Sequence, residues 1–183
     1  MGWYEFEGKR PSVDPSAFVH PEATLIGDVR IGPNCYVGAG ARLRADWGSI
    51  VVDRDANIQE NCVLHVQPGD SVVLGPRCHI GHGAILHGPK LGTHVVVGMG
   101  AILMDGVTVG DGSCIAAGAL VTSGTTVGEN RLLVGVPAKD AGAVDEKLRG
   151  FLDWGTRMYM ALPRRCEQGL QGLPGGPREI GSR

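Results

Sequence analysis

Three of the chain's six histidines stand close together in the segment RCHIGHGAILHG, residues 77–88, as His79, His82 and His87. A neutral imidazole is a common zinc ligand, and three histidines around one ion leave a fourth position open for a reacting water. Zinc in such a site lowers the pKa of the bound water to about 7 and makes hydroxide available at neutral pH. Which histidines can meet at one metal depends on the elements that carry them.

Those elements follow a repeat of six residues. A period of six indicates a hexapeptide β-helix, in which each unit is a short strand and a turn and one aliphatic side chain points inward. The pattern resembles that of the left-handed parallel β-helix family, and the resemblance implies a left-handed, triangular, all-β fold with three units to each coil. The aliphatic positions are Val13, Val19, Leu25, Ile31, Val37, Leu43, then Val52, Ile58, Leu64, then Leu74, Ile80, Leu86, and then Leu91, Val97, Leu103, Val109, Ile115, Val121, Val127 and Leu133.

The six-residue step is broken three times, and we assume that each break lies at a corner and leaves the order of the faces unchanged. The faces then repeat in threes, so Arg44, His65 and His87, each one residue past an inward leucine, lie on one face in successive coils. Adjacent coils should lie about 4.8 Å apart, as strands do in any sheet. His65 and His87 are therefore predicted to be stacked neighbours that can share a metal.

His82 belongs to another corner of the prism and cannot easily reach the metal of His65 and His87 within one subunit. It can reach the equivalent metal of a neighbour if prisms pack side by side around a threefold axis. We therefore predict a homotrimer with a split site: His65 and His87 from one subunit and His82 from the next. Gln59 should lie beneath the His82 corner, whereas His79 lies outside this geometry and is assigned a structural role. Three imidazoles suit Zn²⁺, and also Fe²⁺ or Co²⁺.

The repeat ends where the composition of the chain changes. We predict a β-helix domain over residues 10–137, a C-terminal helical segment over 138–168, and a disordered tail over 169–183, which is rich in Gly and Pro. The apolar residues within 144–162 suit one face of a helix, and Gly155 is expected to interrupt it. This helix should pack along the β-helix of its own subunit or of a neighbour.

Charge and composition narrow the class of protein further. The net charge is -2 with no basic patch, which argues against a nucleic-acid partner. No apolar run approaches the length of a membrane span, and the first residues lack the apolar region of a secretory signal. The five cysteines are scattered, as reduced thiols in a cytoplasmic protein would be. We therefore expect a cytoplasmic protein that binds neither nucleic acid nor membrane.

Four motifs carry a resemblance to a known family. LRADWGSI, NIQENCVLHV, HIGHGAILHG and VGVPAK together resemble the γ-class carbonic anhydrase family over residues 10–165. The YEFEG start and the short loop after His65 are most similar to its phenylacetate-degradation and carnitine-operon branch. The resemblance implies that His65, His82 and His87 are the metal ligands.

The same resemblance implies roles for four further residues. Arg44 and Asp46 of LRAD match the family's subunit-bridging arginine and aspartate. Asn57 and Gln59 of NIQ match polar residues of the active site, with Gln59 near the metal-bound water.

The chain departs from the family pattern at the residues that carry protons. The family's glutamate directly after the LRAD aspartate is replaced here by Trp47, and its acidic loop is shortened to VQPGD. Asp70 and Glu60 are the candidates to take over proton transfer, with Asp70 counted among the catalytic residues. We therefore expect the metal site to be complete and the proton relay to be weakened.

Four functions are compatible with these observations. The first is carbonic anhydrase activity, in which metal-bound hydroxide hydrates CO₂ reversibly at a subunit interface. The second is hydrolysis of an acyl-CoA thioester by the same metal site. The third is a metal-binding scaffold without activity, because fold and site do not fix turnover. The fourth is a hexapeptide acyltransferase, which shares the fold but uses a histidine base in place of three metal ligands.

Overall fold

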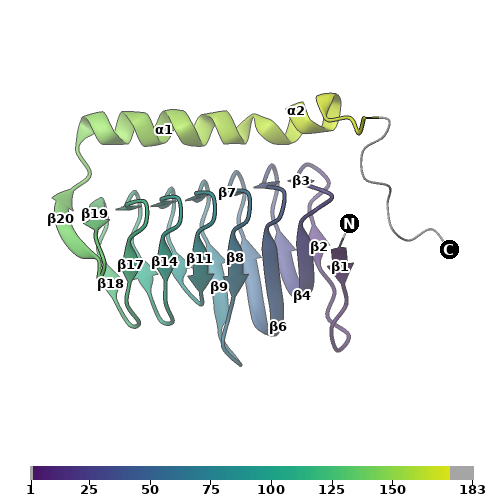
Figure 1. The fold of residues 1–183 in the computed structure, drawn as a ribbon, viewed down its shortest axis with the longest axis horizontal. Coiled ribbons are helices and arrows are strands. Elements are labelled where there is room, and N and C mark those ends of the chain that lie inside the picture. The colour runs from purple at the N-terminus through teal and green to yellow at the C-terminus, as the bar shows by residue number, and fades with distance from the viewer. Residues whose placement is uncertain (1, 174–183) are drawn as a thin grey trace.

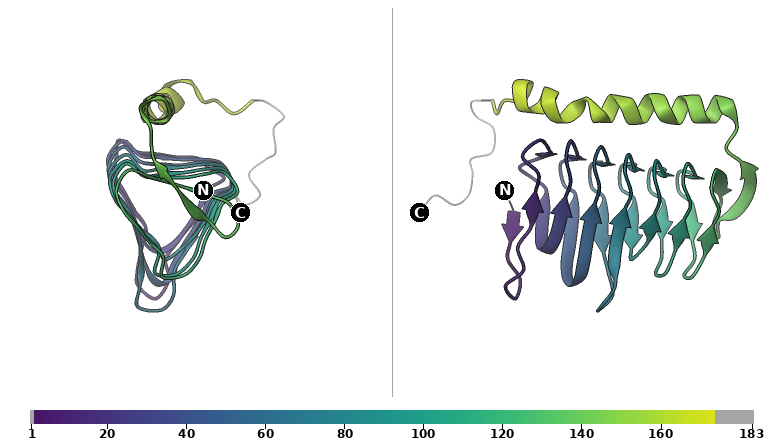
Figure 2. Two further views of the ribbon diagram at one scale, coloured as in Figure 1. Left: turned by 90° about the vertical axis from the view of Figure 1, so that its left-hand side faces the viewer. Right: turned by 180° about the vertical axis from the view of Figure 1, so that it is seen from behind.

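The computed structural model describes residues 2–173. Short parallel strands stack into successive turns of a triangular β-helix, and two helices run along one side of it (Figure 1). The end-on view in Figure 2 shows the triangular section. The predicted fold class, a β-helix of hexapeptide repeats followed by a C-terminal helix, is confirmed.

The strands form three flat faces, and two of these belong to one sheet because β4 and β6 bend around a corner. The first face contains β1 (Gly2–Tyr4), the start of β4 (Thr24–Ile31) and of β6 (Arg42–Val52), β8 (Val63–His65), β11 (Ile85–His87), β14 (Ile102–Leu103) and β17 (Leu120–Val121). The second face contains β2 (Ser12–Val13), the ends of β4 and β6, β9 (Ser71–Leu74), β12 (Lys90–Leu91), β15 (Thr108–Val109) and β18 (Thr126–Val127).

The third face is a separate sheet that faces the helices. It contains β3 (Phe18–Val19), β5 (Tyr36–Val37), β7 (Asn57–Ile58), β10 (His79–Ile80), β13 (Val96–Val97), β16 (Cys114–Ile115) and β19 (Arg131–Val134). After β19 the chain turns back, and β20 (Lys139–Ala143) pairs with it in the antiparallel direction. Figure 2 shows β20 crossing the end of the prism.

The aliphatic repeat forms the core, as the period of six predicts. Leu43 pairs with Leu64, and Leu64 pairs with Leu86, on successive coils of the first face, and all three are buried. Leu74 pairs with Leu91 on the second face, beyond two of the irregular steps. The irregular steps therefore lie at corners, and the order of the faces is kept through them.

One corner depends on a glycine. Gly27 in β4 has a φ of +76°, and a Cβ added there would lie 2.3 Å from the Ala45 carbonyl oxygen. Only glycine adopts this backbone freely and permits so close an approach of the next coil. The bend of β4, where the pairing with β6 shifts register, therefore requires Gly27.

The helical segment differs from the prediction in where it breaks. Helix α1 (Glu146–Met160) is capped by Asp145, whose side chain accepts the Leu148 backbone N–H at 2.7 Å, and it runs through Gly155 without interruption. The predicted break at Gly155 is wrong. The break comes at Ala161, before α2 (Leu162–Gly169), because Pro163 has no N–H to continue the helical ladder.

The boundaries of the domains also differ in detail. The first face begins at β1, which pairs in parallel with β4 and lies before the predicted start at residue 10. Helix α2 ends at Gly169, where the predicted tail begins, and residues 174–183 of that tail lie outside the described residues. Among residues 2–173, no helix has the length and apolar character needed to cross a membrane.

Candidate metal centre

The first face brings His65 and His87 together, as the repeat predicts. The two residues are paired in the register of β8 and β11, so their side chains leave neighbouring coils at the same point. His65 Nδ1 lies 3.1 Å from His87 Nε2. Two nitrogens on one tetrahedral zinc lie about 3.4 Å apart, so a small shift of the rings would let both bind one ion.

Each of these histidines is also held by a carboxylate. Asp46 Oδ1 lies 3.1 Å from His65 Nε2, and Asp105 Oδ1 lies 2.5 Å from His87 Nδ1. Arg44 in turn donates to Asp46 at 2.6 Å. A carboxylate on the outer nitrogen of an imidazole fixes the ring and directs the other nitrogen to a metal. Arg44 and Asp46 therefore pair within one chain and support His65, and their bridging of two subunits stays a prediction.

His82 lies at a different corner, after β10 of the third face. Its Nδ1 lies 2.6 Å from Glu60 Oε2, and Glu60 also accepts the Tyr36 hydroxyl hydrogen at 2.8 Å. The opposite nitrogen, Nε2, lies 3.4 Å from the Tyr159 hydroxyl. His82 therefore has the same arrangement as His65 and His87, with one nitrogen on a carboxylate and the other directed away from it.

One chain does not bring the three predicted ligands together. Across residues 2–173, no three His, Cys, Asp or Glu side chains converge in a way that could hold a metal. His65 and His87 lie on the first face and His82 at the corner of the third. A site with all three ligands requires a second copy of the chain.

The charges in this region follow from the same contacts. Burial lowers the pKa of His65, although its hydrogen bond with Asp46 opposes the shift. Burial raises the pKa of Asp46, Glu60 and Asp105, but hydrogen bonds outweigh it, and each carboxyl ends with a pKa below its usual value. At neutral pH the carboxylates are ionised and the His65 ring is neutral, which is the form that binds a metal.

Asn57 and Gln59 lie beneath α1, away from His65 and His87 of the same chain. Gln59 Nε2 donates to Asn57 Oδ1 at 3.0 Å and lies 2.8 Å from His79 Nε2. Burial lowers the pKa of His79 to about 4, and its ring meets that of Tyr159 edge to face. The structure therefore places Gln59 on the His82 side of the prism, as predicted, and shows His79 as part of the packing under α1.

The predicted relay residues have different surroundings. Asp70 Oδ1 forms an ion pair with Lys90 at 2.7 Å, and that hydrogen bond lowers the pKa of Asp70. Asp70 lies near Gly88, the residue after His87, because a Cβ added at Gly88 would be 3.4 Å from Asp70 Oδ2. The exposed Trp47 ring lies 5.3 Å from the His65 ring. Trp47 thus lies beside His65, and Asp70 lies near the residue that follows His87.

Three residues of this region were not predicted from the sequence. They are Asp105, Lys90 and Tyr159. In the register of β11 and β14, Leu86 pairs with Leu103, so the position one coil past His87 is Met104 and Asp105 lies one residue further along. Tyr159 depends on where α1 packs, and the repeat carries no signal for that.

Comparison with protein families gives two matches. The family of bacterial transferase hexapeptides (six repeats) matches residues 11–45 and 88–123. The hexapeptide repeat of succinyl-transferase matches residues 69–104. Both matches lie in the β-helix.

Two whole-chain relatives share more of the sequence. The carnitine operon protein CaiE of Escherichia coli (strain K12) is 41% identical over 170 residues, which cover 93% of this chain and 87% of that protein. The protein of the same name from Salmonella agona is 40% identical and covers 93% of this chain and 86% of its own length.

Two solved structures have closely similar folds. A hexapeptide transferase family protein from Anaplasma phagocytophilum has a TM-score of 0.86 at 39% identity, with 90% of this chain and 97% of that chain covered. A Bacillus cereus protein described provisionally as an acetyltransferase has a TM-score of 0.88 at 28% identity, with 91% and 96% covered.

Proposed function

Because the chain belongs to the hexapeptide-repeat family that includes the carnitine operon protein CaiE, we propose that it is a metal-dependent enzyme of the γ-carbonic anhydrase type. Its site is assembled between subunits from His65 and His87 of one chain and His82 of the next. The reaction proposed is the reversible hydration of CO₂, and hydrolysis of an acyl-CoA thioester is the alternative use of the same site.

The observation that carries the proposal is the pairing of histidines with carboxylates. His65, His82 and His87 each have one ring nitrogen within 3.1 Å of a carboxylate oxygen. His79, in the same sequence cluster, instead lies against the side-chain amides of Asn57 and Gln59. Carboxylate support on three histidines is typical of metal ligands and is not needed for packing.

The donor set fits zinc, and Fe²⁺ or Co²⁺ would suit the same ligands. When bound by three imidazoles, such an ion supplies a hydrolytic nucleophile at neutral pH. The chain's own residues hold the ligands in place: Asp46, Glu60 and Asp105 orient the rings. Gln59, on the His82 side, offers an amide to orient the reacting molecule.

An apolar row on the first face supports a trimer. Val63, Ile85 and Ile102 are paired in register on β8, β11 and β14, and they are 39%, 40% and 37% exposed. Val63 and Ile85 lie on the strands that carry His65 and His87, and Ile102 lies on the next strand. Burying it against a neighbouring prism would remove apolar surface from water and bring a second chain to the two histidines.

Mixing two inactive variants tests the split site. A His82→Ala chain keeps His65 and His87, and a His87→Ala chain keeps His82, so neither variant alone has a complete set of ligands. If the two are unfolded together and refolded as mixed trimers, about a quarter of the interfaces regain all three ligands. Metal content and CO₂ hydration should recover to that extent, and light scattering should give a trimer.

Two results of the mixing experiment would refute the split site. Mixed trimers that bind no metal would place the ligands elsewhere, and so would a monomer that binds metal tightly. A mixture of His79→Ala and His82→Ala chains is the matched control. The His79→Ala chain keeps all three predicted ligands, so it should bind metal without being mixed.

Acyl transfer is the second candidate, and it is favoured by the similarity to the Bacillus cereus protein. Such an enzyme passes the acyl group to an acceptor other than water. Release of coenzyme A from acetyl-CoA that requires an added amine or alcohol, and that survives removal of metal by a chelator, would favour transfer. Release that needs metal and no acceptor would favour hydrolysis.

A further inference from the structure

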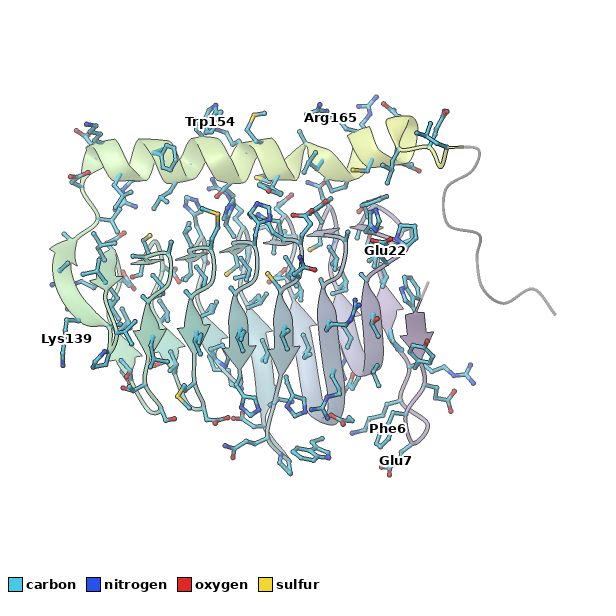
Figure 3. All side chains as sticks on the ribbon, viewed as in Figure 1. Phe6, Glu7, Glu22, Lys139, Trp154 and Arg165 are labelled. Carbon is cyan, nitrogen blue, oxygen red and sulfur yellow. The ribbon has the colours of Figure 1, made fainter. Side chains whose placement is uncertain are left out.

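A cavity of about 350 Å³ lies between α1 and the third face, and Gln59 and His82 of the proposed site line one end of it. Figure 3 shows side chains that extend into the space between the helix and the coils. Val96 and Cys114 form its floor, and Phe151 and Leu152 of α1 form its roof. Cavities of this size are large enough for small organic ligands.

The cavity is polar at one end and apolar along the rest. Gln59, His79 and His82 line it on two adjacent coils, and Val96 and Cys114 follow on the next two. Four coils span about 14 Å at the spacing of strands in a sheet. A ligand that fits must therefore have a polar group beside Gln59 and His82 and an apolar body that extends under α1.

The open side of the cavity is apolar as well. Met99 and Phe151 line it and are 59% and 66% exposed. CO₂ has no apolar body that could occupy this space. We propose that the cavity binds the medium-length apolar acyl group of a thioester substrate, with the carbonyl at the Gln59 and His82 end.

This inference rests on the alternative use of the proposed metal site, the hydrolysis of an acyl-CoA thioester, because the cavity supplies the substrate of that reaction. In the reaction a water oxygen bonds to the carbonyl carbon, the C–S bond breaks, and the sulfur leaves as a thiol with a proton from the water. The free acid that remains ionises to a carboxylate. The acyl chain takes no part in these steps, so the cavity contributes binding and selectivity.

A series of acyl-CoA substrates from acetyl to decanoyl tests the selectivity. Each buried CH₂ adds about 0.8 kcal/mol of transfer free energy, so kcat/KM should rise about fourfold for each added CH₂ until the cavity is full. Binding of octanoate, measured by calorimetry on metal-free and metal-loaded protein, gives a readout that does not depend on activity.

Two glycines of α1 provide a variant and its control. A Cβ added at Gly155 lies 3.9 Å from His79 Cε1, so the side chain of Gly155→Leu enters the cavity. A Cβ added at Gly150 meets nothing within 4 Å, so Gly150→Leu faces open space. Both changes replace a helical glycine with leucine and alter helix propensity equally. Gly155→Leu should lose the gain with chain length and weaken octanoate binding at least tenfold, while Gly150→Leu should behave as wild type.

The possible outcomes separate the cavity from the proposed function. A flat chain-length series without octanoate binding overturns the cavity assignment, even if metal and acetyl-CoA hydrolysis are normal. The cavity assignment is also overturned if the wild type does not bind octanoate and only the Gly155→Leu trimer dissociates. In that case a side chain of a partner subunit occupies the cavity. Octanoate binding that is lost in Gly155→Leu supports the cavity, even if no metal binds and the proposed function fails.

Discussion

His65 Nδ1 and His87 Nε2 lie 3.1 Å apart on neighbouring coils of the first face. Two ring nitrogens at this distance share either a proton or a metal ion, because two lone pairs alone would repel. The outer nitrogens of both rings are occupied by Asp46 and Asp105. The pair is therefore already arranged for a ligand between the rings, and the predictions below concern the residues that keep it so.

Asp105→Asn should weaken metal binding by about 10- to 100-fold, because it removes the charge that orients His87. Affinity can be measured by competition with a chelator of known strength. Asp153→Asn is the matched control, since Asp153 lies 3.5 Å from His94, which is not a predicted ligand. An equal loss in both variants would mean that the effect is general and that Asp105 does not support a metal ligand.

Trp47 should make proton release the slow step of CO₂ hydration, because an indole cannot relay protons. Added imidazole should then raise the maximal rate, and Trp47→Glu should reduce this dependence on buffer. Trp47→Phe keeps an aromatic ring beside His65 and should remain dependent on buffer. Stopped-flow rates measured against imidazole concentration check the prediction, and a wild-type rate that is high without buffer contradicts it.

Asp70→Asn should change the buffer-free rate of CO₂ hydration by less than about twofold. The hydrogen bond from Lys90 lowers the pKa of Asp70, so the carboxylate is a poor proton acceptor near pH 7. The same stopped-flow assay applies. If the variant is slow and imidazole restores its rate, Asp70 is the relay in spite of its ion pair.

His79 should make the protein less stable in acid. Its folded-state pKa of about 4 lies below the value of about 6.5 in the unfolded chain, so the unfolded chain binds the extra proton between these values. Stability should therefore fall as the pH drops from 6.5 to 4, by up to about 3 kcal/mol from this residue.

Urea unfolding at fixed protein concentration across this pH range measures the effect of His79. His79→Gln should flatten the profile relative to wild type. His20→Gln is the control, because His20 follows β3, several coils away from His79 in β10, and its Nδ1 accepts the Glu22 backbone N–H at 3.2 Å. Parallel profiles for wild type and His79→Gln would show that another group dominates.

The sequence was sufficient to predict the register of the coils. The inward residue of each unit is fixed by its burial, so counting sixes and assigning breaks to corners placed His65 next to His87. The same counting placed Gln59 and His82 on the other side of the prism. A repeat of this kind converts sequence distance into spatial distance almost directly.

The helix contacts could not be predicted in the same way. Nothing in the six-residue pattern indicates which face α1 covers, so the contacts of Tyr159 with His79 and His82 were missed. The break in the helix was assigned to Gly155, a residue that helices tolerate at a cost, when Pro163 is the stronger signal.

The strand β20 has a consequence for how the molecule behaves at high concentration. The last coil of a β-helix presents unpaired N–H and C=O groups on which another coil, or another molecule, could continue in parallel. Since β20 runs antiparallel to β19 and crosses the end of the prism, it offers no parallel template there. On the third face, the last coil is thus closed to the parallel addition of another molecule by the five residues of β20 (Lys139–Ala143).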